Sequence, residues 1–89
     1  MIKEIYKICE NVLFQDLDGD MVLLHLDKGC YFSLNEVGSR VVNLINHSKS
    51  IVMIKEELVE EYDVDSLVVD KEVDALIADM VQNNLIEKI

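Results

Sequence analysis

The sequence contains no proline and no tryptophan, and its 89 residues include only three glycines and two cysteines. Without proline or a glycine- or serine-rich stretch, nothing marks a linker, so residues 1–89 are predicted to form a single domain. Long apolar runs are also absent, which predicts neither a secretory signal nor a membrane span. We therefore expect a cytoplasmic protein with no membrane partner.

The side chains that most often carry chemistry are few and scattered. Cys9 and Cys30 lie 21 positions apart with no CxxC pattern, and we expect them to be reduced, buried and inert. His25 and His47 have no acidic partner at a useful spacing, so an outward strand residue and a loop residue are expected. The stretch “DLDGD” (16–20) begins like a calcium loop but lacks the later oxygen ligands. The sequence thus predicts no catalytic residue, no metal, no cofactor and no enzyme activity.

Basic residues are scarce as well, and the formal net charge is −10. Residues 1–54 carry seven acids and five bases, whereas residues 55–89 carry eleven acids and three bases. Such a surface repels the phosphates of nucleic acids. It attracts a basic partner and speeds the encounter with it.

Three β-rich segments, 11–17, 20–26 and 29–34, predict an antiparallel meander. Asp18-Gly19 is a tight-turn signal between the first two, and Gly29 can adopt the positive φ that ends a short hairpin loop. Alternation is predicted to place five apolar side chains on one face: Val22, Leu24 and Leu26 in the second strand, Phe32 and Leu34 in the third.

Apolar residues at helical spacing predict helices over about 36–46, 51–62 and 66–83. Asn35 and Ser50 are suitable N-caps for the first two helices. The third ends at Asn83-Asn84, residues that tolerate the left-handed conformation, and the final “LIEKI” is expected to be an extended tail packed on the core.

Gly38 is an unfavourable residue inside the first helix, at a cost of about 0.8–1 kcal/mol relative to alanine. Its presence predicts the close approach of another backbone, that of the sheet.

Three strands followed by three helices predict an α+β fold of winged helix-turn-helix type. The segment 30–34 contains no lysine, proline or acid, so it would be an unprotected strand at a sheet edge. An extended peptide could add to such a strand, and pockets between strand and helix could read its side chains. The alternative is a winged-helix DNA-binding transcription regulator, but residues 66–83 offer only Lys71 against four acids.

Three stretches in this order and spacing are typical of one family: “VLFQDLDGDMVLLHLDKGCYFSLNEVGSRVVNLI”, “IKEELVEEYDVD” and “VDKEVDALIADMVQNNLI”. The most specific marks are Gly29, Tyr31 and Phe32, with “SLNEVG”, “EEYDV” and the late “NLI”. Over about residues 11–87 the chain resembles the PqqD family, named for coenzyme PQQ synthesis protein D. That family also supplies leader-peptide recognition elements for other ribosomally made, modified peptides (RiPPs), including lasso peptides.

The resemblance implies a non-catalytic protein that binds the leader of a precursor peptide as an extra strand against the third helix. It implies delivery to a maturation enzyme, such as a leader peptidase or a radical-SAM enzyme. We expect no nucleic acid as partner, and a monomer or a strand-swapped dimer.

The predicted peptide-binding residues are Cys30, Tyr31, Phe32, Ser33 and Leu34 at the strand edge, and Val69, Val73, Asp74, Leu76, Ile77 and Met80 on the helix. The chain departs from the family pattern at Val42, where many members have tryptophan, and at Asn84, where many have glycine.

Overall fold

The computed structural model describes residues 4–17 and 20–89, so the turn predicted at Asp18-Gly19 lies outside the described residues. Its elements follow in the order β1 (Tyr6–Ile8), β2 (Val12–Leu17), β3 (Asp20–His25), β4 (Cys30–Leu34), α1 (Glu36–Asn46), α2 (Ile51–Tyr62), α3 (Ser66–Gln82) and β5 (Ile86–Lys88). None of the helices in these ranges is long and apolar enough to cross a membrane.

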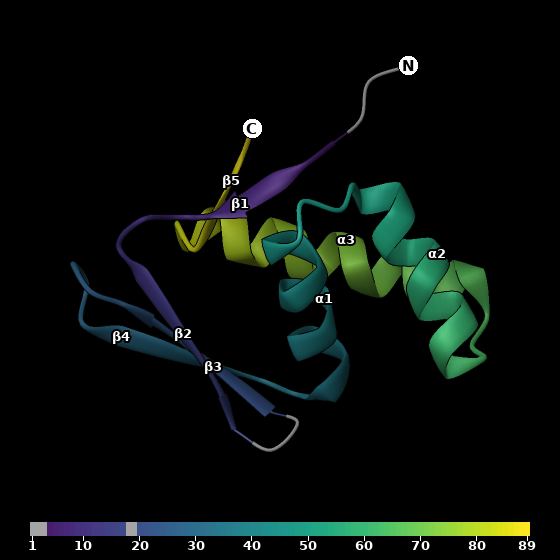
Figure 1. The fold of residues 1–89 in the computed structure, drawn as a ribbon, viewed down its shortest axis with the longest axis horizontal. Helices are drawn as coiled ribbons and strands as arrows, with labels where there is room; N and C mark the ends of the chain where they lie inside the picture. Colours follow the sequence, from purple (N-terminus) through teal and green to yellow (C-terminus); the bar gives the residue numbers. More distant parts are fainter. Residues whose placement is uncertain (1–3, 18–19) are drawn as a thin grey trace.

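The three strands β2, β3 and β4 form an antiparallel sheet in that order (Figure 1). This sheet and the three helices after it confirm the predicted α+β fold. Gly29, just before β4, has a φ of +68°, which confirms the predicted left-handed residue at the end of the second hairpin.

The face predicted for β3 was wrong. His25 is only 3% exposed and lies on the buried face with Met21 and Leu23, whereas Leu26 is 51% exposed. The ring of His25 is held by the backbone N–H of Lys28, which donates to Nδ1 at 3.3 Å. The segment “DMVLLHL” has apolar residues at both alternating sets of positions, so its pattern does not select a face.

The predicted face of β4 is confirmed. Phe32 pairs with Leu23 and Leu34 pairs with Met21, so both side chains turn toward the core. Tyr31 lies on the opposite face of the sheet and is 70% exposed.

The helices begin where the capping residues predict. The side chain of Asn35 accepts a hydrogen bond from the N–H of Gly38 at 2.9 Å, and Ser50 Oγ accepts from Met53 N–H at 3.3 Å. After α3, Asn84 has a φ of 59°, which confirms the left-handed stop predicted at Asn83-Asn84.

The N-terminal segment forms a strand that was not predicted. β1 pairs antiparallel with β5, and the two strands lie side by side in Figure 1. The extended C-terminal tail was predicted, but its partner was not. A three-residue strand has too short an alternation to be recognised, and its pairing spans almost the whole chain.

The core is formed where α1 lies against the sheet and α2 packs on α1 and α3. Its most completely buried side chains are Leu23, Ile45, Ile54, Leu58, Leu85, Ile86, Val41, Val42 and Val73. The close neighbour predicted for Gly38 exists but is not a backbone. A Cβ at Gly38 would lie 3.3 Å from the Leu34 side chain, so the glycine admits the end of β4 against α1.

We predict that Gly29→Ala lowers the free energy of unfolding by about 1–2 kcal/mol, because an alanine is strained at positive φ. No atom lies within 4 Å of the position that its Cβ would occupy, so the loss measures conformation and not a clash. Gly29→Asn, the matched control, should lose less, because asparagine tolerates this conformation. Urea denaturation checks both, and an unchanged alanine variant would contradict the assignment.

Candidate functional site

β4 pairs with β3 on one side only, and no strand of the described residues pairs with its other side. In an antiparallel edge strand, alternate residues direct their N–H and C=O groups away from the sheet. Cys30–Leu34 carries no lysine, proline or acidic side chain that would blunt this edge. The edge is therefore able to pair with another chain.

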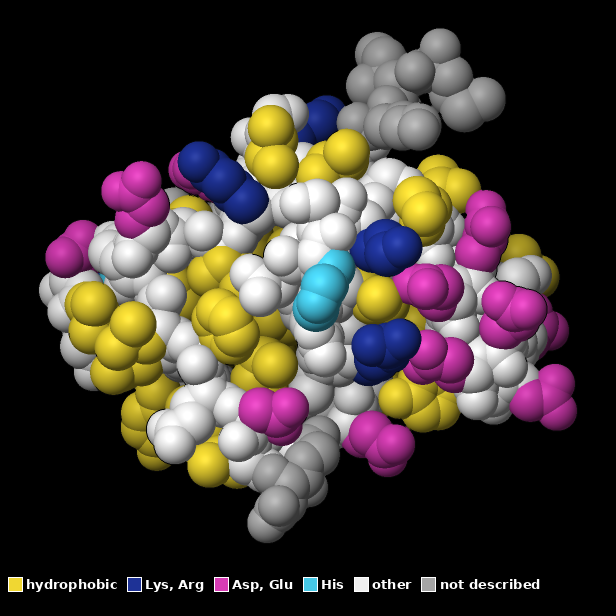
Figure 2. All heavy atoms as spheres, in the orientation of Figure 1, with side chains coloured by type: hydrophobic (Ala, Val, Ile, Leu, Met, Phe, Trp, Pro, Cys, Tyr) yellow, Lys and Arg dark blue, Asp and Glu magenta, His cyan; other side chains and the backbone are white. Residues whose placement is uncertain are grey.

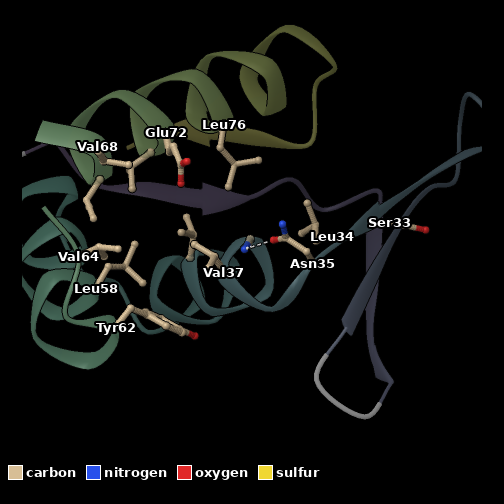
Figure 3. Close-up of a pocket in the computed structure, with 14 residues that line it drawn as sticks. Ser33, Leu34, Asn35, Val37, Leu58, Tyr62, Val64, Val68, Glu72 and Leu76 are labelled. Atoms are coloured by element: carbon tan, nitrogen blue, oxygen red, sulfur yellow. Dashed lines mark hydrogen bonds between the residues drawn. The ribbon is translucent and has the colours of Figure 1, made fainter. Parts of the chain in front are cut away.

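A groove of about 560 Å³ lies where β4 runs into α1 (Figure 3). The chain supplies its walls from four places: the end of β4, the first turns of α1, the end of α2 with the loop after it, and one side of α3. Its lining residues include Ser33, Leu34, Val37, Val41, Tyr62, Val64, Val68, Val69, Glu72, Val73 and Leu76. Most are apolar, so the groove suits apolar side chains.

The corner between β4 and α1 is held by side-chain hydrogen bonds. Asn35 caps α1 through the N–H of Gly38, as described above, and Ser39 Oγ donates to the carbonyl oxygen of Leu34 at 3.3 Å. Ser39 is itself buried. These bonds set the direction in which β4 meets the helix, and so the position of Leu34 in the groove.

Five of the predicted site residues line this groove: Ser33, Leu34, Val69, Val73 and Leu76. Cys30, Tyr31 and Phe32 lie further along β4, beside the open edge but outside the groove.

The remaining three predicted residues lie elsewhere. Ile77 and Met80 are 7% and 2% exposed and belong to the core. Asp74 pairs with Lys55 of α2, with Nζ and Oδ1 2.8 Å apart, so it points away from the groove. Sequence periodicity identified the apolar side of α3 but did not separate its core-facing part from its groove-facing part.

Sequence reasoning did not predict that α1, the α2–α3 connection and two further residues of α3 line the groove. Val37 and Val41 were identified only as part of the apolar stripe of α1. Val68 was identified only as part of the apolar side of α3, and Glu72 only as one of the acids of that helix. The spacing of Val68, Glu72 and Leu76, four residues apart, was the available signal, because such residues share one side of a helix. Val42, the departure from the family pattern, is fully buried and does not line the groove.

One ion pair joins α1 to the end of α2 next to the groove. Arg40 binds Glu61 through two nitrogens, with Nη2 2.6 Å from Oε1 and Nε 3.0 Å from Oε2. This hydrogen bonding lowers the pKa of Glu61 and raises that of Arg40. Burial raises the pKa of the adjacent Tyr62, and the carboxylates of Glu36 and Glu61 raise it further. The pair fixes the helix end that carries Tyr62 into the groove wall.

Among the described residues, no three or more His, Cys, Asp or Glu side chains are grouped so that they could hold a metal ion. The two cysteines are free and partly buried. Burial raises the pKa of the Cys9 thiol, with Glu87 adding to the effect, which disfavours the reactive thiolate.

The fold and the groove define a class of protein: a small α+β domain with an open sheet edge beside an apolar cleft. The family model for PqqD, coenzyme PQQ synthesis protein D, matches residues 20–86. The chain belongs to the PqqD family.

Two solved structures are similar to this one. The structure of TbiB1 in complex with the TbiA(beta) leader peptide has 33% sequence identity and a TM-score of 0.87, over 91% of this chain and 94% of that chain. A lasso peptide synthetase B1 complexed with the leader peptide has 22% identity and a TM-score of 0.85, over 92% and 96% of the two chains. The second likeness concerns the fold alone. A comparison with curated proteins gave no match.

We predict that the Arg40–Glu61 pair makes stability depend on pH. Because the pKa of Glu61 is lowered in the folded state, its contribution is present at neutral pH and is lost as the pH falls through that folded pKa. Glu61→Gln should therefore be less stable than the parent at about pH 7, by no more than about 1 kcal/mol. This deficit should disappear as the pH falls through the folded pKa of Glu61.

The control is Glu60→Gln, which removes the same charge from the neighbouring exposed position. Denaturation at several pH values measures both variants against the parent. A Glu61→Gln deficit that persists unchanged in acid would show that the carboxylate charge is not its cause.

Proposed function

We propose that this protein is a non-catalytic recognition element that captures the leader of a ribosomally made precursor peptide. The observation that carries the proposal is the open edge of β4, which leads directly into an apolar groove. The leader peptide in the TbiB1 complex, a structure 33% identical to this chain, supports the same role. The captured precursor would be delivered to a maturation enzyme, such as a leader peptidase or a radical-SAM enzyme, in a lasso-peptide pathway or that of another RiPP.

Strand addition supplies both parts of the recognition. The main chain of an extended leader would hydrogen-bond to Cys30–Leu34, which gives affinity without regard to sequence. Every second leader side chain would then lie on the same face as Phe32 and Leu34, toward the groove. The intervening side chains would lie with Tyr31 on the other face.

The charge of the molecule favours capture of a basic leader. On the face in Figure 2, acidic side chains gather over the helical side, and hydrophobic ones extend toward the sheet. With a net charge of −10, the field of the whole protein speeds the approach of a cationic peptide and weakens as salt is added. The same charge disfavours DNA as a partner, because α3 would present Asp70, Glu72, Asp74 and Asp79 to phosphates.

The open edge of β4 could also allow two copies of this protein to form a dimer. A strand that pairs on one side only can pair with the same strand of a second copy. Leader capture and strand-swapped dimerisation would then compete for β4. A peptide that binds the edge should therefore favour the monomer.

The main-chain mode predicts a dependence on alternate positions of the leader. N-methylation of residues whose N–H groups face β4 should weaken binding by about tenfold or more, because each loses a hydrogen bond. N-methylation of the intervening residues should change it little. Calorimetry with the leader of the precursor encoded beside this protein measures these affinities, and NMR should show amide shifts along 30–34. If those amides do not shift, leader capture by strand addition is wrong.

The groove predicts a second effect. Val68 is 47% exposed and lines the groove, so Val68→Asn should weaken leader binding about fivefold or more, through loss of apolar contact. Leu67→Asn is the matched control, because Leu67 is 69% exposed on the preceding position of α3 and lies outside the groove. Equal affinities of the two variants would show that the peptide does not enter the groove.

A further inference from the structure

One charged side chain lines the apolar groove. Glu72 lies on α3 between Val68 and Leu76, and its carboxylate points into the cleft in Figure 3. Residues four apart share one side of a helix, so the carboxylate interrupts an otherwise apolar strip of the wall. The other lining residues of the described chain carry no charge.

Glu72 differs from the neighbouring acids of the same helix. Asp70 and Asp74 point toward α2, where Lys55 Nζ lies 3.4 Å from Asp70 Oδ1 and 2.8 Å from Asp74 Oδ1. Within residues 4–17 and 20–89, Glu72 takes part in no ion pair and no side-chain hydrogen bond. Glu72 is an exposed residue, so water reaches its carboxylate through the open groove.

Occupation of the groove would change that solvation. A peptide laid against Val68 and Leu76 removes water from Glu72, and a carboxylate that loses water without gaining a partner weakens binding. The cost is avoided if the peptide itself supplies a cation at this point, since a charge-assisted hydrogen bond is about twice as strong as a neutral one. A leader without such a group would lose affinity through desolvation alone.

We infer that Glu72 selects leaders that carry a lysine or arginine side chain facing the groove. This inference rests on the proposed leader capture and deepens it. Because alternate residues of an added strand face the same way, the basic residue should have apolar residues two positions before or after it, which would fill the space near Leu34 and Val37. The groove would then read an apolar–x–basic or basic–x–apolar pattern.

Double-mutant cycles between the protein and the leader test the inference. The probe is the synthetic leader of the precursor encoded beside this protein, with each lysine or arginine replaced singly by glutamine. Glu72→Gln should weaken binding of the unmodified leader about tenfold. One leader replacement should have the same effect on the parent protein and little further effect on Glu72→Gln. Glu60→Gln, with the same loss of charge on the exposed face of α2, should bind as the parent does.

Charge reversal gives a gain of affinity as an independent readout. Glu72→Lys should bind the unmodified leader poorly and recover about tenfold when the identified basic residue of the leader is changed to glutamate. Both cycles should weaken as salt is raised.

The outcomes separate the two proposals. One outcome is that the leader shifts the amide signals of β4 while every basic replacement has equal effects on the parent and on Glu72→Gln. In that case the role of Glu72 is overturned and leader capture stands. A leader that lacks lysine and arginine altogether, yet binds, overturns it in the same way. If the leader does not perturb residues 30–34, leader capture fails and the inference about Glu72 fails with it.

Discussion

A strand that pairs on one side only leaves backbone groups whose hydrogen-bonding partners must come from water or from another chain. In this protein that strand is β4, and its position follows from the order β2-β3-β4, in which the last strand of the meander is an edge. The hydrogen bonds of Asn35 and Ser39 then turn the chain into α1 directly after Leu34. The open edge of β4 therefore leads directly into the groove.

The core, the groove and α2 lie on different sides of α3. Ile77 and Met80 are buried, Val68 and Glu72 line the groove, and Asp74 is held by Lys55 on the side toward α2. A single helix thus meets the core, the cleft and a neighbouring helix within a few turns. Because one helix serves both the core and the groove, an 89-residue chain can form a groove without giving up its core.

Much of the fold was predictable because the signals are local. Alternating apolar residues, the caps Asn35 and Ser50, and the left-handed positions at Gly29 and Asn84 each act within a few residues. The predictions failed where the deciding contact is distant. β1 is recognisable only through its partner β5, and the buried face of β3 depends on which side α1 covers, so His25 was placed outward when it is buried.

The sequence by itself determined the order of the three central strands and the three helices, the acidic charge and the unprotected character of residues 30–34, since each depends on residue type and short-range spacing. Only the tertiary structure decided that this strand adjoins a groove, and which residues line it. Leu34, Val37, Tyr62 and Glu72 come from four separate segments. The packing of the helices brings them together, and no spacing along the chain records that packing.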